Sequence, residues 1–262
     1  MHLIETIILG IIQGFTEFIP VSSSGHLVIV QNLFGAASDH LFLEFINIGT
    51  FLALLVYFRA KIIAIIKDVF IGKNYRLAMN ILITAVPAGA VGFFLSKFID
   101  SNAFFGSIVV VAVSLTVVGL LMVILERLPK ASAVKDGAAL SSWRALLIGL
   151  VQVFALIPGV SRSGSTMIAG RLAGLNAAAA AEYSFLASLP IMFGVTLKTL
   201  VSDRGYLIHN LGPLLIGNLF AFAAGILAVG FLMRYLSNHG LAIFGWYRIG
   251  LAAILTVVLL IH

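Results

Sequence analysis

Two short polar turns in an apolar chain carry the side chains that are suited to chemistry. The first turn covers residues 21–26 and follows Glu17, and the second covers residues 158–164. Between them they supply a carboxylate, an imidazole, several hydroxyl groups and a guanidinium. Such groups hold phosphate oxygens, activate nucleophiles and move protons. We interpret the two turns as halves of one anion site, suited to a diphosphate.

Phosphoryl transfer depends mainly on positioning and on stabilising charge at the phosphoryl oxygens. Arg162 and the starts of the helices that follow the serine clusters are expected to hold the phosphate. Glu17 is expected either to bind a divalent cation or to orient water as a base. His26 either activates Ser23 as a nucleophile or protonates the leaving oxygen. The remaining hydroxyl groups of the turns are predicted to bind phosphate: Ser22, Ser24, Ser161, Ser163 and Thr166.

Each of these side chains also has a structural explanation. Serines that follow a proline are often helix caps, Glu17 and Arg162 could form an ion pair that only fixes the fold, and His26 could be a packing residue. Arg171 stands near the end of an apolar segment and is expected to extend to the membrane interface. Three further charged residues lie in apolar runs, where pairing between helices explains them as well as function does: Glu44, Glu182 and Arg248.

The composition requires a membrane protein. Of the 262 residues, 61% are hydrophobic and 10% are charged, with a mean hydropathy of +1.14, whereas soluble domains have about 25% charged residues. The chain has no cysteine, which excludes disulfides and thiolate ligands. We predict an all-α polytopic membrane protein with six transmembrane helices of roughly 20 residues each. The predicted spans are 41–58, 77–95, 104–125, 181–200, 211–233 and 241–261.

Two further apolar segments are too short to span a membrane as single helices. Residues 3–35 are interrupted at Pro20, and residues 145–173 are interrupted at Pro158. Irregular backbone at membrane depth has to be buried in protein or line a water-filled cavity. We therefore predict that both segments are re-entrant helical hairpins.

The two hairpins also resemble each other in sequence. Residues 10–13 (GIIQ) match residues 149–152 (GLVQ), and each is followed at the same spacing by a turn of serines and a glycine. Because each hairpin precedes three spans, the second copy is inverted in the membrane, an arrangement that favours a binding site at the midplane. The chain is thus predicted to be one membrane domain, residues 1–262, made of two repeats, residues 1–126 and 141–262.

The basic residues orient this topology. One side receives Arg59, Lys61, Lys67, Lys73, Arg76, Arg127, Lys130, Lys135, Arg144 and Arg234, and the other receives Lys97, Lys198 and Arg204. The richer side is predicted to be cytoplasmic, which places both termini outside. The net charge of +6 is explained in this way and does not indicate a nucleic-acid partner. The N-terminus lacks the basic region of a signal peptide, so we expect the whole chain to be mature.

Residues 13–26 (QGFTEFIPVSSSGH) and 158–166 (PGVSRSGST) resemble the two signatures of undecaprenyl-diphosphatases of the bacitracin-resistance type. The resemblance covers nearly the whole chain, and the family fold is similar to the one predicted above. It implies hydrolysis of undecaprenyl diphosphate to undecaprenyl phosphate and phosphate. This reaction recycles the carrier lipid for peptidoglycan synthesis, cell-wall biogenesis and cell shape. The motif match carries the functional positions of the family onto Glu17, Ser22, Ser23, His26, Arg162, Ser163 and Thr166.

The resemblance further implies a divalent cation, Mg²⁺ or Ca²⁺, a location in the bacterial plasma membrane, bacitracin resistance on overexpression and often a homodimer. One difference concerns Gln13, which stands where the family often has glutamate. An amide is neither a base nor an anionic metal ligand, so Glu17 becomes the expected metal ligand. Gln13 is kept as a supporting residue together with Glu44 and Glu182.

Two other classes of function compete with the enzyme. Inverted repeats and a midplane anion site also suit a transporter or flippase for a lipid phosphate or another anion. The enzyme explains better why Glu17 and His26 stand beside the phosphate-binding turns. A purely structural membrane protein would tolerate apolar residues in place of its intramembrane charges.

Overall fold

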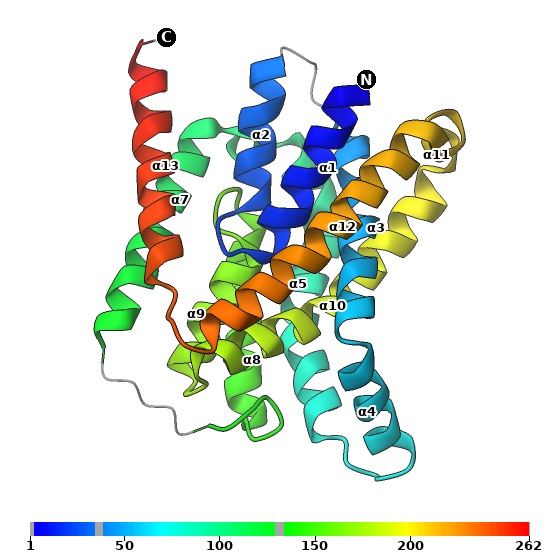
Figure 1. Ribbon diagram of the computed structural model, residues 1–262, viewed down its shortest axis with the longest axis vertical. Coiled ribbons are helices and arrows are strands. Elements are labelled where there is room, and N and C mark those ends of the chain that lie inside the picture. Colours follow the sequence, from blue (N-terminus) through cyan, green and yellow to red (C-terminus); the bar gives the residue numbers. More distant parts are fainter. Residues whose placement is uncertain (1–2, 35–38, 129–133, 262) are drawn as a thin grey trace.

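The computed structural model describes residues 3–34, 39–128 and 134–261, which form a bundle of helices (Figure 1). Within these residues the only strand-like feature is an isolated bridge between Val134 and Leu175. Six helices are long and apolar enough to cross a membrane, which confirms the predicted all-α polytopic fold. They are α3 (His40–Tyr57), α5 (Arg76–Ser101), α7 (Ile108–Arg127), α10 (Ala177–Ser202), α12 (Leu211–Leu236) and α13 (Ala242–Ile261).

Two helical hairpins contain the polar turns. The first consists of α1 (Leu3–Phe18) and α2 (Ser23–Phe34). The second consists of α8 (Ser142–Val153), the 3-10 helix η1 (Phe154–Leu156) and α9 (Arg162–Leu172). In Figure 1 the first turn lies near the middle of the molecule, while the N-terminus and the far end of α2 lie toward the same end. That the hairpins are re-entrant and belong to an inverted repeat stays a prediction.

Small residues let the hairpins approach the spans closely. A Cβ atom on Gly10 or Gly14 of α1 would come within 2.5 Å of a backbone oxygen of α12. A Cβ atom on Gly149 of α8 would come within 2.7 Å of the backbone oxygen of Thr84 in α5. Interfaces between membrane helices are enriched in small residues because these let the backbones approach closely. The first hairpin therefore packs against a span of the second half, and the second hairpin packs against a span of the first half.

The predicted start of the third span at residue 104 is wrong. A short helix, α6 (Ala103–Gly106), covers that position, and Ser107 begins α7 because its Oγ accepts from the backbone N of Val110 at 3.5 Å. Hydropathy does not detect such a cap inside an apolar run. Two connecting helices were likewise not predicted, α4 (Arg59–Phe70) and α11 (Arg204–His209).

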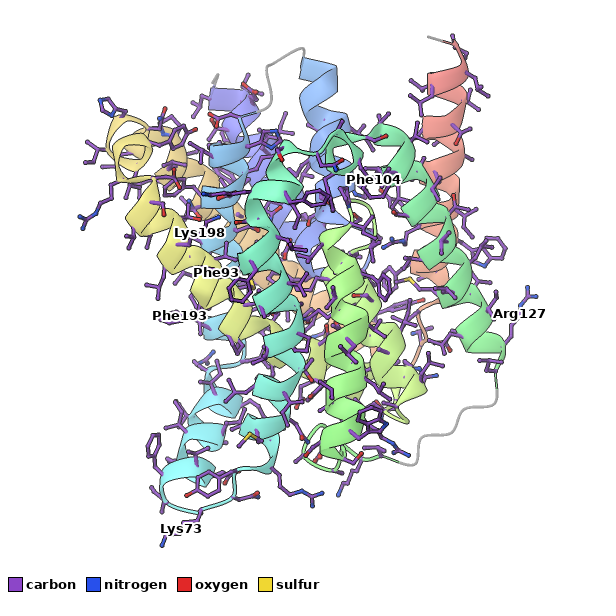
Figure 2. The ribbon with its side chains drawn as sticks, turned by 180° about the vertical axis from the view of Figure 1, so that it is seen from behind. Lys73, Phe93, Phe104, Arg127, Phe193 and Lys198 are labelled. Carbon is purple, nitrogen blue, oxygen red and sulfur yellow. The ribbon has the colours of Figure 1, made fainter. Side chains whose placement is uncertain are left out.

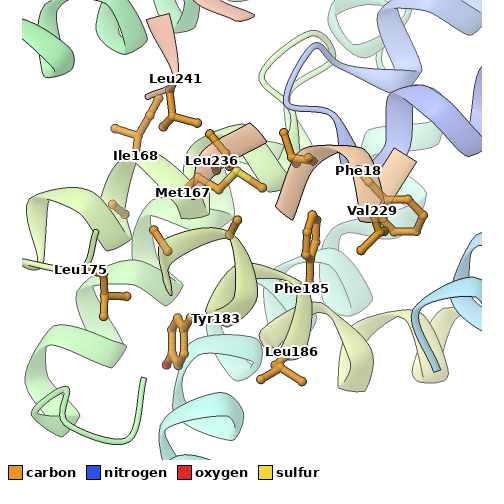
Figure 3. Close-up of a cluster of buried hydrophobic side chains, with 14 of the residues drawn as sticks. Phe18, Met167, Ile168, Leu175, Tyr183, Phe185, Leu186, Val229, Leu236 and Leu241 are labelled. Carbon is orange, nitrogen blue, oxygen red and sulfur yellow. The ribbon is translucent and has the colours of Figure 1, made fainter. Parts of the chain in front are cut away.

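The apolar side chains divide between a core and an outer surface. The core contains Phe18, which meets Phe185 edge to face at 5.6 Å between ring centroids, and it continues along α9, α10 and α12 (Figure 3). Phe93 and Phe193 point away from the bundle and are 72% and 53% exposed (Figure 2). Large exposed apolar side chains of this kind are expected where a protein faces lipid.

Candidate active site

The carboxylate of Glu17 is the centre of the site. Its Oε1 accepts from Nη2 of Arg162 at 2.6 Å. Its Oε2 accepts from Oγ of Ser23 at 2.8 Å and from Nε2 of Gln13 at 3.1 Å. Only 14% of the Glu17 side chain and 19% of the Arg162 side chain are exposed. The structure thus joins an acid of the first hairpin to the arginine of the second, with a hydroxyl group at the distance of a nucleophile from its base.

Ser22 and Ser161 have the same unusual backbone conformation. Their φ angles are 75° and 72°, in the left-handed region that is uncommon for residues other than glycine. Oγ of Ser22 accepts from N of Gly25 at 3.4 Å, and Oγ of Ser161 accepts from N of Gly164 at 3.2 Å. Each serine is therefore a helix cap, as the structural explanation expects. The conformation costs about 1–3 kcal/mol, and such strain is concentrated at ligand and active sites.

The two turns contact each other. Oγ of Ser24 accepts from N of Gly159 at 3.5 Å, and Oγ of Ser163 donates to the backbone oxygen of Glu17 at 3.4 Å. Helices α2 and α9 both begin at these turns, and the first N–H groups of a helix have no partner within it. The positive ends of two helices therefore lie beside Arg162, which suits a ligand with several negative charges.

Both ring nitrogens of His26 have partners other than Ser23. Nδ1 donates to the backbone oxygen of Ser22 at 2.8 Å, because a carbonyl group can only accept. Nε2 lies 2.7 Å from Oη of Tyr247 on α13 and accepts from it in the neutral tautomer. The two rings are nearly parallel, with an interplanar angle of 6°. His26 is therefore oriented by α13, while Ser23 is bonded to Glu17.

Thr166 lies behind the second turn and supports it. Its Oγ1 donates to the backbone oxygen of Arg162 at 2.8 Å and lies 2.5 Å from Oγ of Ser184. Only 1% of Thr166 is exposed. This side chain fixes the start of α9, on which Arg162 stands.

Glu44 and Glu182 lie outside the two turns and contact residues that are not part of them. Oε1 of Glu182 is 2.8 Å from Nζ of Lys61, and Oε2 of Glu44 accepts from Oγ1 of Thr199 at 3.4 Å. Both carboxylates thus contact other helices, which is the structural alternative that their positions allowed.

Two buried arginines differ in what they contact. The prediction that Arg171 extends to the membrane interface is wrong. Its side chain is only 8% exposed, and its Nη2 lies 3.8 Å from Oε2 of Glu126. Arg248 is fully buried and donates to backbone oxygens of both turns. Within the described residues no ion pair joins Arg248 to a carboxylate, so pairing between charged helices does not account for it.

Three contacts of the site were missed in the sequence. Asn47 on α3 accepts from Nε2 of Gln13 at 2.5 Å, Tyr247 contacts His26, and Ser184 contacts Thr166. Asn47 could have been found as an uncharged amide inside an apolar run, and Tyr247 as the neighbour of a buried charge. Ser184 had no distinguishing signal, because serine is common in membrane helices.

Glu17 leaves room for one bond to a cation. A carboxylate has about four lone-pair positions, and Arg162, Ser23 and Gln13 occupy three of them. The described residues contain no group of three or more His, Cys, Asp or Glu side chains that would form a protein cage. Magnesium commonly takes one or two carboxylates and fills its remaining positions with substrate phosphates and water. The side chains present therefore fit a cation that the substrate brings or shares.

Fold and site together define a multi-pass membrane protein with a cluster of polar and charged side chains between two hairpins. A family described as bacitracin resistance protein BacA matches residues 6–254, and the chain belongs to this family. A relative from Nitrosospira multiformis named undecaprenyl-diphosphatase is 37% identical over 97% of this chain and 94% of its own length. Relatives of the same name from Cereibacter sphaeroides and Bordetella pertussis are 35% and 34% identical, each over 97% of this chain and 96% of their own lengths.

Proposed function

We propose that this protein hydrolyses undecaprenyl diphosphate to undecaprenyl phosphate and inorganic phosphate. The observation that carries the proposal is the arrangement of Ser23, Glu17 and Arg162, in which one carboxylate holds a hydroxyl group and a guanidinium from two hairpins. The relatives from several bacteria, all named undecaprenyl-diphosphatase over nearly the full chain, support the substrate.

Glu17 is the base in this proposal. It takes the proton of the nucleophile as the new bond to the terminal phosphorus forms and the bond to the bridging oxygen breaks. Undecaprenyl phosphate leaves with that oxygen and its electron pair. Ser23 is the favoured nucleophile because its hydroxyl already donates to Glu17 at 2.8 Å. Water then releases the phosphate from Ser23 in a second displacement.

Arg162 and the helix starts stabilise the transferred phosphate. The guanidinium is paired with Glu17 through one nitrogen. Its other N–H groups are the donors that bind phosphate oxygens when the substrate enters the site. The N-termini of α2 and α9 add positive partial charge where negative charge is concentrated on the phosphoryl oxygens. His26 and Tyr247 lie at the side of this region and hold the first turn in shape.

A divalent cation, Mg²⁺ or Ca²⁺, belongs to the proposal, with Glu17 as its protein ligand. When bound it would neutralise charge on the two phosphates. We expect chelation to lower activity and added cation to restore it.

The wider setting is also proposed. The protein would lie in the bacterial plasma membrane with both termini outside, and it would act as a monomer or a homodimer. Because the chain has no cysteine, a Lys73→Cys variant carries a unique thiol. A thiol reagent that does not cross membranes should label this variant only after the cells are opened, and labelling of intact cells would reverse the topology.

A transporter or flippase is the competing function. It shares the anion site, but it gives no role to a serine hydroxyl bonded to Glu17. None of the relatives described above carries a transporter's name.

The test is phosphate release from undecaprenyl diphosphate by the purified protein in detergent, with Mg²⁺, Ca²⁺ or a chelator. Glu17→Ala and Arg162→Ala, each shown to be folded, are measured in parallel. We expect the wild type to release phosphate and both variants to lose at least about 10²-fold in rate. No release by folded wild type with either cation would reject the enzyme and leave transport as the function to test.

A further inference from the structure

Arg248 is the most unusual charge in the described part of the chain. It lies on α13, near the C-terminus of the chain, and none of its side chain is exposed. Nη1 donates to the backbone oxygen of Pro20 at 3.2 Å, and Nη2 donates to the backbone oxygens of Gly159 at 2.5 Å and Val160 at 3.0 Å. Its Nε is buried and has no partner among the described residues. One guanidinium therefore joins the first turn to the second.

The three acceptors stand close in sequence to the site residues. Pro20 lies between Glu17 and Ser23, and Gly159 and Val160 immediately precede the strained Ser161 and then Arg162. The position of one turn relative to the other decides whether Arg162 reaches the carboxylate that Ser23 also contacts. Apart from the Arg162–Glu17 pair itself, at 2.6 Å, the side-chain contacts described above between the turns are longer, at 3.4 and 3.5 Å.

Gly159 makes this arrangement possible. Its φ is +87°, and a Cβ atom there would come within 2.7 Å of the backbone oxygen of Val111 and 2.9 Å of Cβ of Ser114. The second turn thus passes tightly between α7 and the guanidinium. In this position the backbone oxygens of Gly159 and Val160 face Arg248.

The geometry requires an arginine. Its planar group offers five N–H donors in a fixed fork and can hold acceptors on two sides at once, whereas lysine offers one nitrogen atom. A buried charge without a counter-ion is costly, so a purely structural connection would be made at lower cost by neutral donors. We infer that Arg248 is a positioning residue, which holds the two turns in the register needed for Glu17, Ser23 and Arg162 to act on one phosphate.

This inference rests on the proposed function for its kinetic part. Because Arg248 is fully buried, we expect no contact between it and the substrate, so its loss should lower kcat and leave KM nearly unchanged. A shift of about 1 Å in the reacting groups is enough for a loss of about 10²-fold. A residue that bound the diphosphate would instead raise KM.

The kinetic test uses Arg248→Lys, which keeps the charge, and Arg248→Gln, which keeps neutral donors. We expect kcat to fall about tenfold for lysine and about 10²-fold for glutamine, with KM within about threefold of wild type. The matched control is the double variant Glu126→Gln with Arg171→Met, which neutralises another buried arginine site away from the turns. It should keep the wild-type kcat. Unchanged kcat in folded Arg248→Gln, or a rise in KM that accounts for the loss, would overturn the inference.

A second measurement does not depend on catalysis. Phe15 on α1 and Leu150 on α8 are exposed, outside the site and on different hairpins. Spin labels on the double variant Phe15→Cys with Leu150→Cys report the distance between the hairpins, since no native cysteine competes. We expect one narrow distance distribution with Arg248 and a broader or displaced one in Arg248→Gln. Identical distributions would reject the positioning role even if activity is lost, and a broadened distribution would support it even if the wild type releases no phosphate.

Discussion

The turn before α2 and the turn before α9 share a backbone and differ in chemistry. Each contains a serine in the left-handed region that caps the next helix with its Oγ, and in each this hydroxyl lies 3.2 Å from the Oγ two residues later. The residue directly after the strained serine is Ser23 in one turn and Arg162 in the other. Both bond to the carboxylate of Glu17, one at each oxygen.

The comparison shows that two turns with the same backbone conformation supply different chemical groups to the site. The first hairpin supplies the acid and the hydroxyl group, and the second supplies the positive charge. Gln13 and Gln152 stand at matching positions, yet only Gln13 contacts Glu17, while Gln152 donates to the backbone oxygen of Thr84 at 3.4 Å. Similar backbone geometry therefore does not make the two hairpins equivalent, and substitutions at matching positions should have unequal effects.

The largest expected effect is that of Glu17→Gln. This variant keeps the shape of the side chain but removes the base and the negative charge that pairs with Arg162, so kcat should fall about 10³-fold. The measurement is phosphate release from undecaprenyl diphosphate under saturating substrate. Glu182→Gln is the control, because Glu182 faces Lys61 away from the turns and should keep wild-type activity. Substantial activity in Glu17→Gln would remove the carboxylate from the mechanism.

The next effect separates the two hydroxyl groups. Ser23→Ala should lower kcat by at least about 10²-fold, because it removes the group that Glu17 holds. Ser163→Ala should lower it no more than about tenfold, because within the described residues the Ser163 hydroxyl bonds to a backbone oxygen and a neighbouring hydroxyl and to no carboxylate. Rapid-quench measurement of a phosphate burst tests Ser23 as the nucleophile. Equal effects of the two substitutions would contradict the assignment of Ser23, rather than Ser163, as the nucleophile.

A smaller effect distinguishes the two glutamines. Gln13→Leu removes a donor from Glu17 and should lower kcat about tenfold. Gln152→Leu should leave kcat unchanged and should not lower the thermal unfolding midpoint, because Oε1 of Gln152 is buried and none of the described residues bonds to it. Thermal scans of both variants in detergent accompany the kinetics. A strong loss of kcat in Gln152→Leu would contradict the prediction that the two glutamines have unequal roles.

The smallest expected effect is that of Tyr247→Phe. It removes one hydrogen bond to His26, worth about 1 kcal/mol, so activity should fall about fivefold. Comparison with His26→Ala shows whether tyrosine acts through the imidazole. The double variant Tyr247→Phe with His26→Ala is then compared with His26→Ala alone. If the double variant is no slower, Tyr247 acts on the reaction through His26.

The fold was largely predictable because lipid contact imposes long apolar runs. Six spans and two interrupted segments follow from length and composition. Errors arose where a cap rather than hydropathy sets the boundary, as at Ser107, and where an apolar segment such as α4 connects two spans without crossing.

The residues of the site were largely predictable from the sequence, but their hydrogen-bond partners were less so. Types and motifs pointed to Glu17, Ser23 and Arg162, which the structure brings together. Partners that depend on tertiary packing could not be derived, and Tyr247 and Asn47 reach the site from distant parts of the chain. The backbone acceptors of Arg248 were equally hidden, because a sequence does not show which carbonyl groups a side chain will face.

The crossed packing of the hairpins has a consequence for biogenesis. Helix α1 packs against α12, and the turns are joined by a residue of α13. During synthesis the first hairpin leaves the ribosome long before either helix does. Until then its polar turn lacks the contacts that the finished protein gives it, and a chain released before residue 248 lacks the guanidinium that joins the two turns.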